Sequence, residues 1–277
     1  MKLFLTTCLL IIFASSFKSA QPKNHPHSLL TRAQIREAEQ RLADIGYWTG
    51  VVDGRFDTAT GWALIAFQKY EGRTITGKLT IDELEAIRTS DAPRPRDSGY
   101  AHVEVDLDRQ VLLIVGELTE SADKSAHSKD SRVRVLPVST GNDKKFMSDG
   151  VESIAYTPRG RFAVYDKSFG WENGQLGSVY YANYISGGVA IHGYLSVPNE
   201  PASHGCIRIP MFAARQVSRQ LQLGTIVLVY DSVSFVSAKE WAENPKLKEA
   251  AMLNGAEPDY VDNKKSLRKT RTRTTRT

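Results

Sequence analysis

The residues best suited to covalent chemistry lie in one short segment, Ser203-His204-Gly205-Cys206-Ile207-Arg208. A free cysteine has a pKa near 8.5, so nucleophilic catalysis at neutral pH needs a base or a positive neighbour. Gly205 would let the backbone approach a substrate closely and turn amide N–H groups toward a developing oxyanion. Arg208 could order the loop or bind a carboxylate. The segment therefore predicts Cys206 as a nucleophile.

Two histidines could serve as the base for this thiol. His204 precedes Cys206 by two positions, and residues i and i+2 of an extended segment share a face roughly 6.6 Å apart. His192 ends a predicted strand over 189–192 and could be brought alongside from a neighbouring strand. The spacing alone leaves both assignments open.

The N-terminus predicts export. Lys2 is followed by an apolar run over 3–13, which is typical of a secretory signal peptide and too short to span a bilayer. We expect a signal peptide over 1–20 and a periplasmic or cell-wall location; an uncleaved anchor is the alternative. Cys8 would leave with the signal, so Cys206 would be the one remaining thiol and no internal disulfide could form.

The positive charge is concentrated at the C-terminus. The chain carries a net charge of +5, and residues 262–277 alone carry +6, so the remainder sums to −1. We expect a C-terminal extension over 232–277 that ends in a basic, disordered tail. The tail could contact anionic wall polymers or a membrane surface. Nucleic acid is not an expected partner of an exported chain.

Helical periodicity fills the first part of the chain, after a polar linker over 21–30. Thr31 can cap a helix whose apolar positions include Ala38 and Leu42, and a second helix is predicted over 58–70. The run Thr80-Ile81-Asp82-Glu83 predicts a capping box that opens a third helix. Residues 31–88 are therefore expected to form a small three-helix bundle.

A proline-containing linker over 89–99 leads into short strand-like runs, so we expect a second, mainly β domain over 100–231. Residues 117–131 predict a loop, and one helix is expected over 211–221. Many short strands with few helices indicate a mixed β sandwich or barrel. The predicted strands span 102–106, 110–115, 133–138, 162–165, 179–184, 189–192 and 225–230.

The helical region resembles the peptidoglycan-binding module of bacterial wall hydrolases and transpeptidases. The resemblance rests on Gly46-Tyr47-Trp48-Thr49-Gly50, on 53–60 (DGRFDTAT) and on Ala66-Phe67-Gln68. It implies that residues 31–88 bind peptidoglycan. A helical bundle without a ligand is the alternative, and Tyr47, Trp48 and Phe56 could be core residues or sugar platforms.

The second domain resembles the L,D-transpeptidase catalytic domain of the YkuD-like family. The resemblance rests on Ile191-His192-Gly193 with the 203–208 segment, and upstream on 157–162, Leu176-Gly177 and Asn183-Tyr184. It implies that Cys206 is the nucleophile and His192 the base. It gives supporting or oxyanion roles to Gly193, Ser203, His204, Gly205 and Arg208. It implies no cofactor and no metal.

The implied reaction is a two-step acyl transfer in peptidoglycan biosynthesis and cell-wall biogenesis. Cys206 would attack a stem tetrapeptide, release D-alanine and pass the acyl group to an amine. The acceptor could be a stem amine, water or a protein lysine. Three aromatic residues are candidate substrate contacts: Trp171, Tyr184 and Tyr194.

Two other functions remain open at this point. A zinc hydrolase would use His192, His204 and Cys206 as metal ligands. A non-catalytic wall-binding protein would depend on the helical module alone, and Cys206→Ala would leave its role intact.

Overall fold

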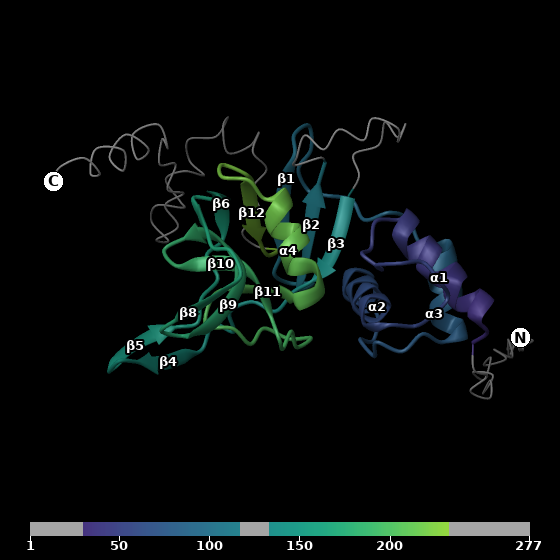
Figure 1. Cartoon of the computed structure of the whole chain (residues 1–277), viewed down its shortest axis with the longest axis horizontal. Helices are drawn as coiled ribbons and strands as arrows, with labels where there is room; N and C mark the ends of the chain where they lie inside the picture. Colours follow the sequence, from purple (N-terminus) through teal and green to yellow (C-terminus); the bar gives the residue numbers. More distant parts are fainter. Residues whose placement is uncertain (1–29, 117–132, 233–277) are drawn as a thin grey trace, which may run out of the picture.

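The computed structural model describes residues 30–116 and 133–232, which form three helices followed by a mainly β region (Figure 1). The predicted signal peptide, the loop over 117–131 and nearly all of the C-terminal extension lie outside these residues. The helices are α1 (Arg32–Asp44), α2 (Thr58–Tyr70), α3 (Ile81–Thr89) and α4 (Met211–Gln220). The strands are β1 (His102–Asp106), β2 (Val111–Val115), β3 (Val133–Pro137), β4 (Lys145–Ser148), β5 (Val151–Ile154), β6 (Gly160–Ala163), β7 (Asp166–Lys167), β8 (Trp171–Gly174), β9 (Gly177–Ser186), β10 (Val189–Tyr194), β11 (Ile207–Pro210) and β12 (Ile226–Tyr230).

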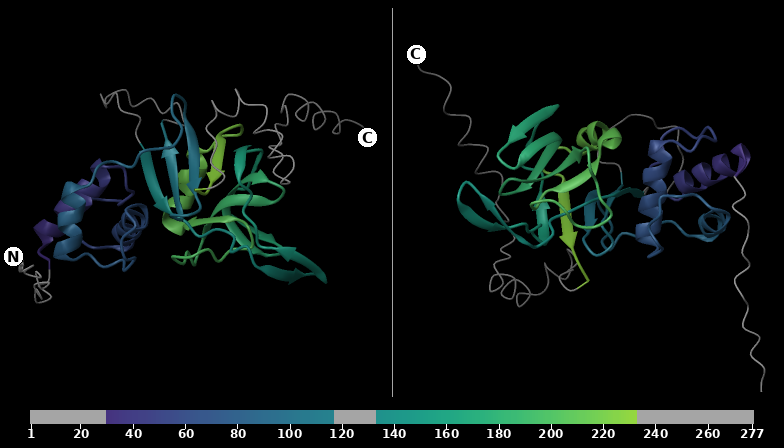
Figure 2. Two further views of the ribbon diagram at one scale, coloured as in Figure 1. Left: turned by 180° about the vertical axis from the view of Figure 1, so that it is seen from behind. Right: turned by 90° about the horizontal axis from the view of Figure 1, so that it is seen from below.

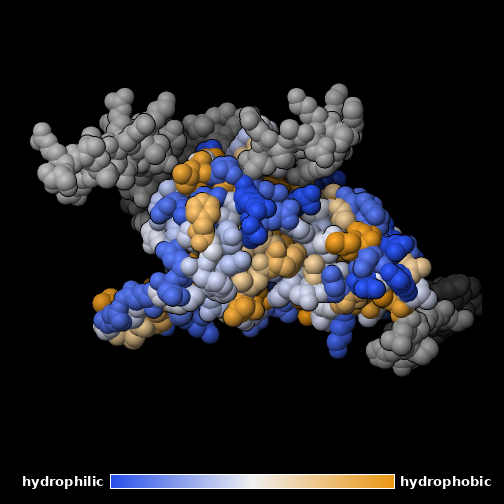
Figure 3. Space-filling view, in the orientation of Figure 1, coloured by the Kyte–Doolittle hydropathy of each residue, from blue (hydrophilic) through white to orange (hydrophobic). Residues whose placement is uncertain are grey.

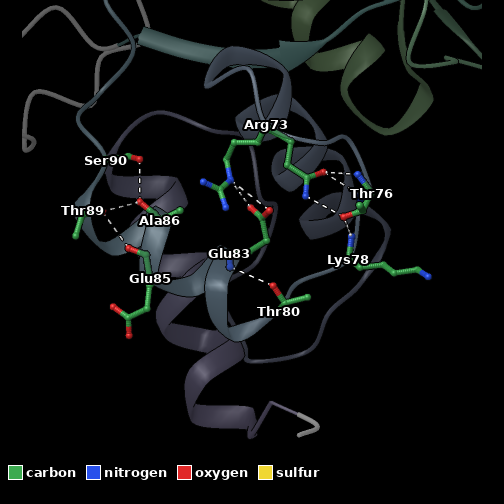
Figure 4. A network of polar contacts seen from close by, with 11 residues as sticks. Arg73, Thr76, Lys78, Thr80, Glu83, Glu85, Ala86, Thr89 and Ser90 are labelled. Atoms are coloured by element: carbon green, nitrogen blue, oxygen red, sulfur yellow. Dashed lines mark hydrogen bonds and ion pairs between the residues drawn. The ribbon is translucent and has the colours of Figure 1, made fainter. Parts of the chain in front are cut away.

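Each of the first three helices begins at a side-chain cap. Thr31 and Gln34 form a reciprocal capping box at α1, and Asp57 accepts from the Thr60 N–H at α2. At α3, Thr80 accepts from the Glu83 N–H, but the Glu83 carboxylate is bound by Arg73 at 3.1 Å (Figure 4). The predicted capping box is therefore only half formed, because an ion pair with the preceding loop takes the acidic side chain.

The β region contains two five-stranded sheets and a hairpin. The first sheet has the order β3-β2-β1-β12-β6, and in the second β11, β10, β9 and β7 follow one another while β8 also pairs with β9. The pairs β1–β12 and β10–β11 are parallel, so both sheets are mixed, as the sequence predicted. The hairpin of β4 and β5 projects at the end of the molecule opposite to α1–α3 (Figures 1 and 2).

One core joins the two sheets through α4. This helix contacts β9, β10 and β11, and its buried residues Ala213, Ala214 and Val217 cluster with residues of both sheets, as does Leu221 directly after the helix. A second core lies between the helical module and the outer side of the first sheet. It includes Tyr47 and Phe67 together with residues of β2 and β3, so the module is packed against the β region.

Two hydrogen bonds, one between backbone groups and one from a side chain, reinforce the packing of the module against the first sheet. The Val135 N–H donates to the Gly46 carbonyl at 2.9 Å. Lys69 of α2 is buried and donates from Nζ to the Val138 carbonyl at 2.8 Å. The linker before β1 is held as well, because the buried carboxylate of Glu104 accepts from the Arg96 and Asp97 N–H groups.

Of the three aromatic residues considered as sugar platforms, two are structural. Tyr47 and Trp48 are buried, whereas Phe56 is 40% exposed. Tyr47 and Trp48 therefore belong to the core and are not open sugar platforms. Among the described helices, none combines the length and apolar character that crossing a membrane requires.

Candidate active site

The candidate active site is built where β10 and β11 run side by side. Their parallel pairing places Ile191 opposite Ile207 and His192 opposite Arg208. Ile191 and Ile207 point into the core and are fully buried. Because side chains alternate along a strand, His192 and Arg208 face the other side of the sheet, and Cys206 precedes β11 on that same side.

Gly193 explains how closely β10 can pack on the helix behind it. A Cβ at this position would lie 2.5 Å from the Ala214 Cβ and 3.2 Å from the Met211 sulfur. Any larger side chain would push α4 away from the strand that carries His192. The expected supporting role of Gly193 is thus explained here by packing against α4.

The ring of His192 is fixed by its own neighbour. Nδ1 lies 3.0 Å from the Gly193 carbonyl oxygen, which can only accept, so Nδ1 carries the proton. The Nε2 lone pair is consequently the basic position of the neutral ring. Burial lowers the pKa of His192 to about 4, the Gly193 bond opposes this, and the positive charge of Arg208 lowers the pKa further. His192 is therefore neutral at pH 7.

The Cys206 thiol is partly buried and held in its protonated form. Its Sγ lies 3.7 Å from the Gly188 carbonyl oxygen, in the turn between β9 and β10. Burial raises the pKa of Cys206, while a backbone hydrogen bond at Ala190 and the charge of Arg208 oppose the rise. At neutral pH the resting pair is therefore a thiol with a neutral imidazole, and a proton must move before the sulfur can attack.

The loop before the thiol is tied down by hydroxyl groups. Ser203 Oγ donates to the Cys206 carbonyl at 2.5 Å and accepts from the Gly205 N–H at 3.0 Å. Thr157 Oγ1 donates to the Gly205 carbonyl at 2.8 Å and accepts from the Gly141 N–H. The Gly205 N–H is thus engaged inside the loop. Thr157 belongs to the 157–162 motif, but no local pattern indicates its contact with Gly205.

Gly205 is required by its conformation. Its φ is +136°, and a Cβ there would lie 2.8 Å from the Tyr156 carbonyl oxygen. Ser139 also holds the following strand, since its backbone N–H and C=O both bond to Arg208. The chain therefore enters β11 through a sharp turn that no other residue type fits without strain.

The candidate residues differ in which of the others they contact. Tyr194 contacts two of them, because Arg208 lies over its ring at 4.2 Å and its ring meets that of His192 edge-on. His204 is exposed, and its ring lies 4.6 Å from that of Phe146 in β4. Its environment therefore differs from that of His192, which is buried.

The two remaining aromatic candidates lie along β8 and β9. Tyr184 donates to Glu172 at 2.9 Å. Burial, the hydrogen bond to Glu172 and the negative charge of Glu172 raise the pKa of Tyr184 to about 12. Negative charge on Cys206 would add to this rise, so Tyr184 lies within electrostatic reach of the sulfur. Trp171 is 53% exposed and packs against Tyr180, and no described contact links it to the thiol.

The zinc alternative finds no support in this geometry. Across residues 30–116 and 133–232, no three His, Cys, Asp or Glu side chains are gathered closely enough to hold a metal ion. His192 and His204 have different environments, one buried beside Gly193 and the other exposed against Phe146.

Comparison with known proteins decides the family. Residues 31–87 match the family model of a peptidoglycan binding domain, and residues 100–229 match that of the L,D-transpeptidase catalytic domain. The crystal structure of the L,D-transpeptidase (residues 123–326) from Xylanimonas cellulosilytica DSM 15894 is 36% identical, with a TM-score of 0.62. The match covers 71% of this chain and 93% of that one. The chain belongs to the L,D-transpeptidase family.

A second solved structure is less similar to this chain. The L,D-transpeptidase (Yku) from Stackebrandtia nassauensis is 19% identical over 75% of this chain and 95% of its own, with a TM-score of 0.41. No curated relative matches the chain. The L,D-transpeptidase domain and the helical domain together make this chain a cell-wall transpeptidase, and both indicate peptidoglycan as its partner.

Proposed function

We propose that this L,D-transpeptidase works by cysteine-dependent acyl transfer, with Cys206 as the nucleophile and His192 as the base. The observation that carries the proposal is the hydrogen bond from His192 Nδ1 to the Gly193 carbonyl, which leaves Nε2 as the acceptor on the side of the sheet where Cys206 lies. The lowered pKa of His192 leaves Nε2 unprotonated at neutral pH and so free to accept a proton, but it also makes the ring a weaker base than a histidine whose pKa lies near 7.

In the first half-reaction, Cys206 Sγ attacks the carbonyl carbon of the third residue of a stem tetrapeptide. Its proton passes to His192 Nε2 and from there to the departing amine as the carbon–nitrogen bond breaks. D-alanine leaves, and a thioester remains on Cys206. We assign the oxyanion to the Cys206 N–H, since the Gly205 N–H is engaged by Ser203.

In the second half-reaction, an acceptor amine attacks the thioester carbon. His192 takes the proton that the amine loses, the carbon–sulfur bond breaks, and the proton returns to the sulfur. A stem amine as acceptor forms a cross-link between two strands. Water in its place gives a carboxypeptidase, and a protein lysine gives an anchoring reaction.

Several residues would position the reacting pair. We propose that Arg208 stabilises the thiolate, that Ser203 and Gly205 fix the turn before Cys206, and that Tyr194 holds the ring of His192 and the guanidinium of Arg208. Tyr184 would line the donor site, and we propose only a peripheral contact for Trp171, which is the most exposed of the three aromatic candidates.

Intact-mass spectrometry tests the nucleophile. The protein is incubated with a carbapenem and then with a disaccharide-tetrapeptide, beside Cys206→Ala and His192→Asn. We expect one covalent adduct, loss of D-alanine and a cross-linked dimer with the unaltered protein, and none of these with Cys206→Ala. His192→Asn should slow acylation by about 10²–10⁴-fold. An adduct on Cys206→Ala would overturn the proposal.

We also propose that the chain is exported to the periplasm or cell wall and that residues 31–88 bind peptidoglycan. The apolar run over 3–13 supports export, and the match over 31–87 supports binding. Mass spectrometry of the protein from its native cell envelope should give an N-terminus after residue 20. Phe56 is the exposed aromatic residue of the module. If the module binds through the face that carries Phe56, the substitution Phe56→Ala should abolish cosedimentation of the Cys206→Ala protein with sacculi.

A further inference from the structure

A second candidate binding site lies beside α4, away from Cys206. A groove of about 610 Å³ is lined by β7, Phe169, Tyr181 of β9, one side of α4 and the residues that follow it to Leu223. We call it the α4 groove. Its volume is within the usual range for sites that take small ligands.

The α4 groove and the thiol lie on opposite faces of the second sheet. Gly193 faces α4, since a Cβ there would collide with Ala214. His192, the preceding residue of the strand, therefore faces away from α4, on the side of Cys206. A ligand in the α4 groove would not compete directly with one at the thiol.

The charge of the α4 groove is positive. Arg215 and Arg219 are one helical turn apart on the exposed side of α4, where two like charges destabilise a helix slightly. Within the part of the chain that the structure describes, neither guanidinium has a carboxylate within ion-pair distance. Asp166 is the acidic lining residue, and its Oδ1 accepts from the Lys167 N–H.

The far end of the groove is held rigid by Lys167. Its ammonium group donates to the Ser218 and Leu221 carbonyls, which end α4. Lys167 thus fixes the helix against β7, while the two arginines remain for a ligand. The walls are built before any ligand arrives, which lowers the entropy lost on binding.

The rim of the α4 groove is apolar. Phe169 is 81% exposed and Leu223 is 61% exposed. The face that carries α4 shows hydrophilic and hydrophobic residues interspersed and no single large apolar patch (Figure 3). The α4 groove thus offers two guanidinium groups and two exposed apolar side chains, a combination that suits a short peptide with free carboxylates.

We propose that the α4 groove binds a carboxylate-bearing stem peptide of a peptidoglycan strand, at a second site distinct from the one at Cys206. This proposal rests on the proposed function for its choice of ligand, because stem peptides are the peptides that the reaction presents. The site would hold a neighbouring stem of the same wall while the reacting stem occupies the other face.

Isothermal titration of the full-length Cys206→Ala protein with a disaccharide-tetrapeptide tests this. Because we propose that residues 31–88 also bind peptidoglycan, the expected result is a difference: Cys206→Ala should show one more site than Cys206→Ala with Arg215→Gln and Arg219→Gln. Arg219→Gln alone should weaken the second site roughly tenfold, the effect of about 1.4 kcal/mol. Gln keeps the helix propensity of Arg, so α4 should still form. Arg94→Gln removes an equal charge from an exposed position outside the groove and should change nothing.

The ligand is identified by changing its carboxylates. A fully amidated tetrapeptide should lose the second site and keep the first. Identical isotherms with and without the two arginines would overturn the proposal, as would a second site that persists with the amidated peptide. Competition by inorganic phosphate with no effect of amidation would assign the groove to a phosphate polymer and also overturn it.

The outcomes are separable from those of the catalytic proposal. The variants Arg215→Gln and Arg219→Gln with Cys206 intact should turn over the soluble disaccharide-tetrapeptide at an unchanged rate. Loss of that turnover would place the groove in the catalytic site and contradict the proposal. Turnover by Cys206→Ala would instead overturn the nucleophile and leave the titration result standing.

Discussion

Arg208 lies directly opposite His192 in the parallel pairing of β10 with β11, and its positive charge lowers the pKa of both His192 and Cys206. The same charge therefore adds to the lowering that burial imposes on the pKa of His192 and opposes the rise that burial imposes on the pKa of the Cys206 thiol. Tyr194 holds this arrangement, because its ring contacts both Arg208 and His192.

The first prediction concerns the pH dependence of acylation. Because burial lowers the pKa of His192 to about 4, the neutral ring persists down to that pH. The value of kcat/KM for carbapenem acylation should be level from about pH 5 to 7 and fall as the pH drops through about 4. Stopped-flow mixing measures this. A fall centred on pH 6.5, the ordinary value for histidine, would show that the ring is not desolvated in the working enzyme.

The second prediction is that Arg208→Gln shifts the pH profile upward. Removing the positive charge raises the pKa of His192 and of Cys206 together, so the acid fall and the onset of free thiolate both move to higher pH. The rate at which a small alkylating agent modifies Cys206, measured against pH, reports the pKa of the thiol independently of catalysis. Arg208→Lys keeps the charge but loses the planar stacking on Tyr194, so it should preserve the profile while lowering the rate. Equal shifts of the pH profile in Arg208→Gln and Arg208→Lys would mean that the stacking on Tyr194, and not the positive charge, is responsible.

The third prediction tests the hydroxyl network of the loop. Thr157→Val keeps the shape but removes the hydroxyl group that joins the Gly205 carbonyl to the Gly141 N–H. The Gly205 carbonyl and the Gly141 N–H would then be buried without a hydrogen-bond partner, which destabilises the fold by about 1–3 kcal/mol. Thr157→Ser retains the hydroxyl group and should recover most of the stability. Urea denaturation followed by fluorescence measures both, and unchanged stability in Thr157→Val would contradict the assignment.

Local signals predicted most of the elements. Thr31 caps α1 at the expected place, and α2 has the predicted bounds. β4, β5, β7, β8 and β11 were not predicted. β4 and β5 are largely exposed, and Met147, Val151 and Ile154 do not alternate with polar residues clearly enough to indicate a strand. β11 is only four residues long and follows directly on the loop that carries Cys206.

The candidate site depends on contacts between distant segments, which the sequence does not reveal. Spacing could not choose between His192 and His204, because the choice depends on which strand lies beside β11 and on which side chain is buried. The parallel pairing of β10 with β11 and the contact of His204 with Phe146 favour His192, which is the base that we propose. Contacts such as Thr157 to Gly205 join positions 48 residues apart, and no local pattern indicates them.

The last prediction concerns the interface between the helical module and the β region. Burial lowers the pKa of Lys69 to about 8, and Glu200 opposes the shift only in part. Between about pH 8 and the ordinary value of 10.5, the unfolded chain holds a proton that the folded protein has released. The free energy of unfolding should therefore rise with pH across this window, by at most about 1.4 kcal/mol per pH unit.

Lys69→Met removes the titrating group and should flatten that rise. It also leaves the Val138 carbonyl without its donor, one residue before Ser139, which bonds to Arg208. Lys78→Met, at an exposed position of the same module, is the matched control and should keep the rise. Denaturation curves from pH 7.5 to 10.5 measure all three proteins. A rise that survives in Lys69→Met would mean that another group is responsible, and that the ammonium of Lys69 is not buried at this interface in solution.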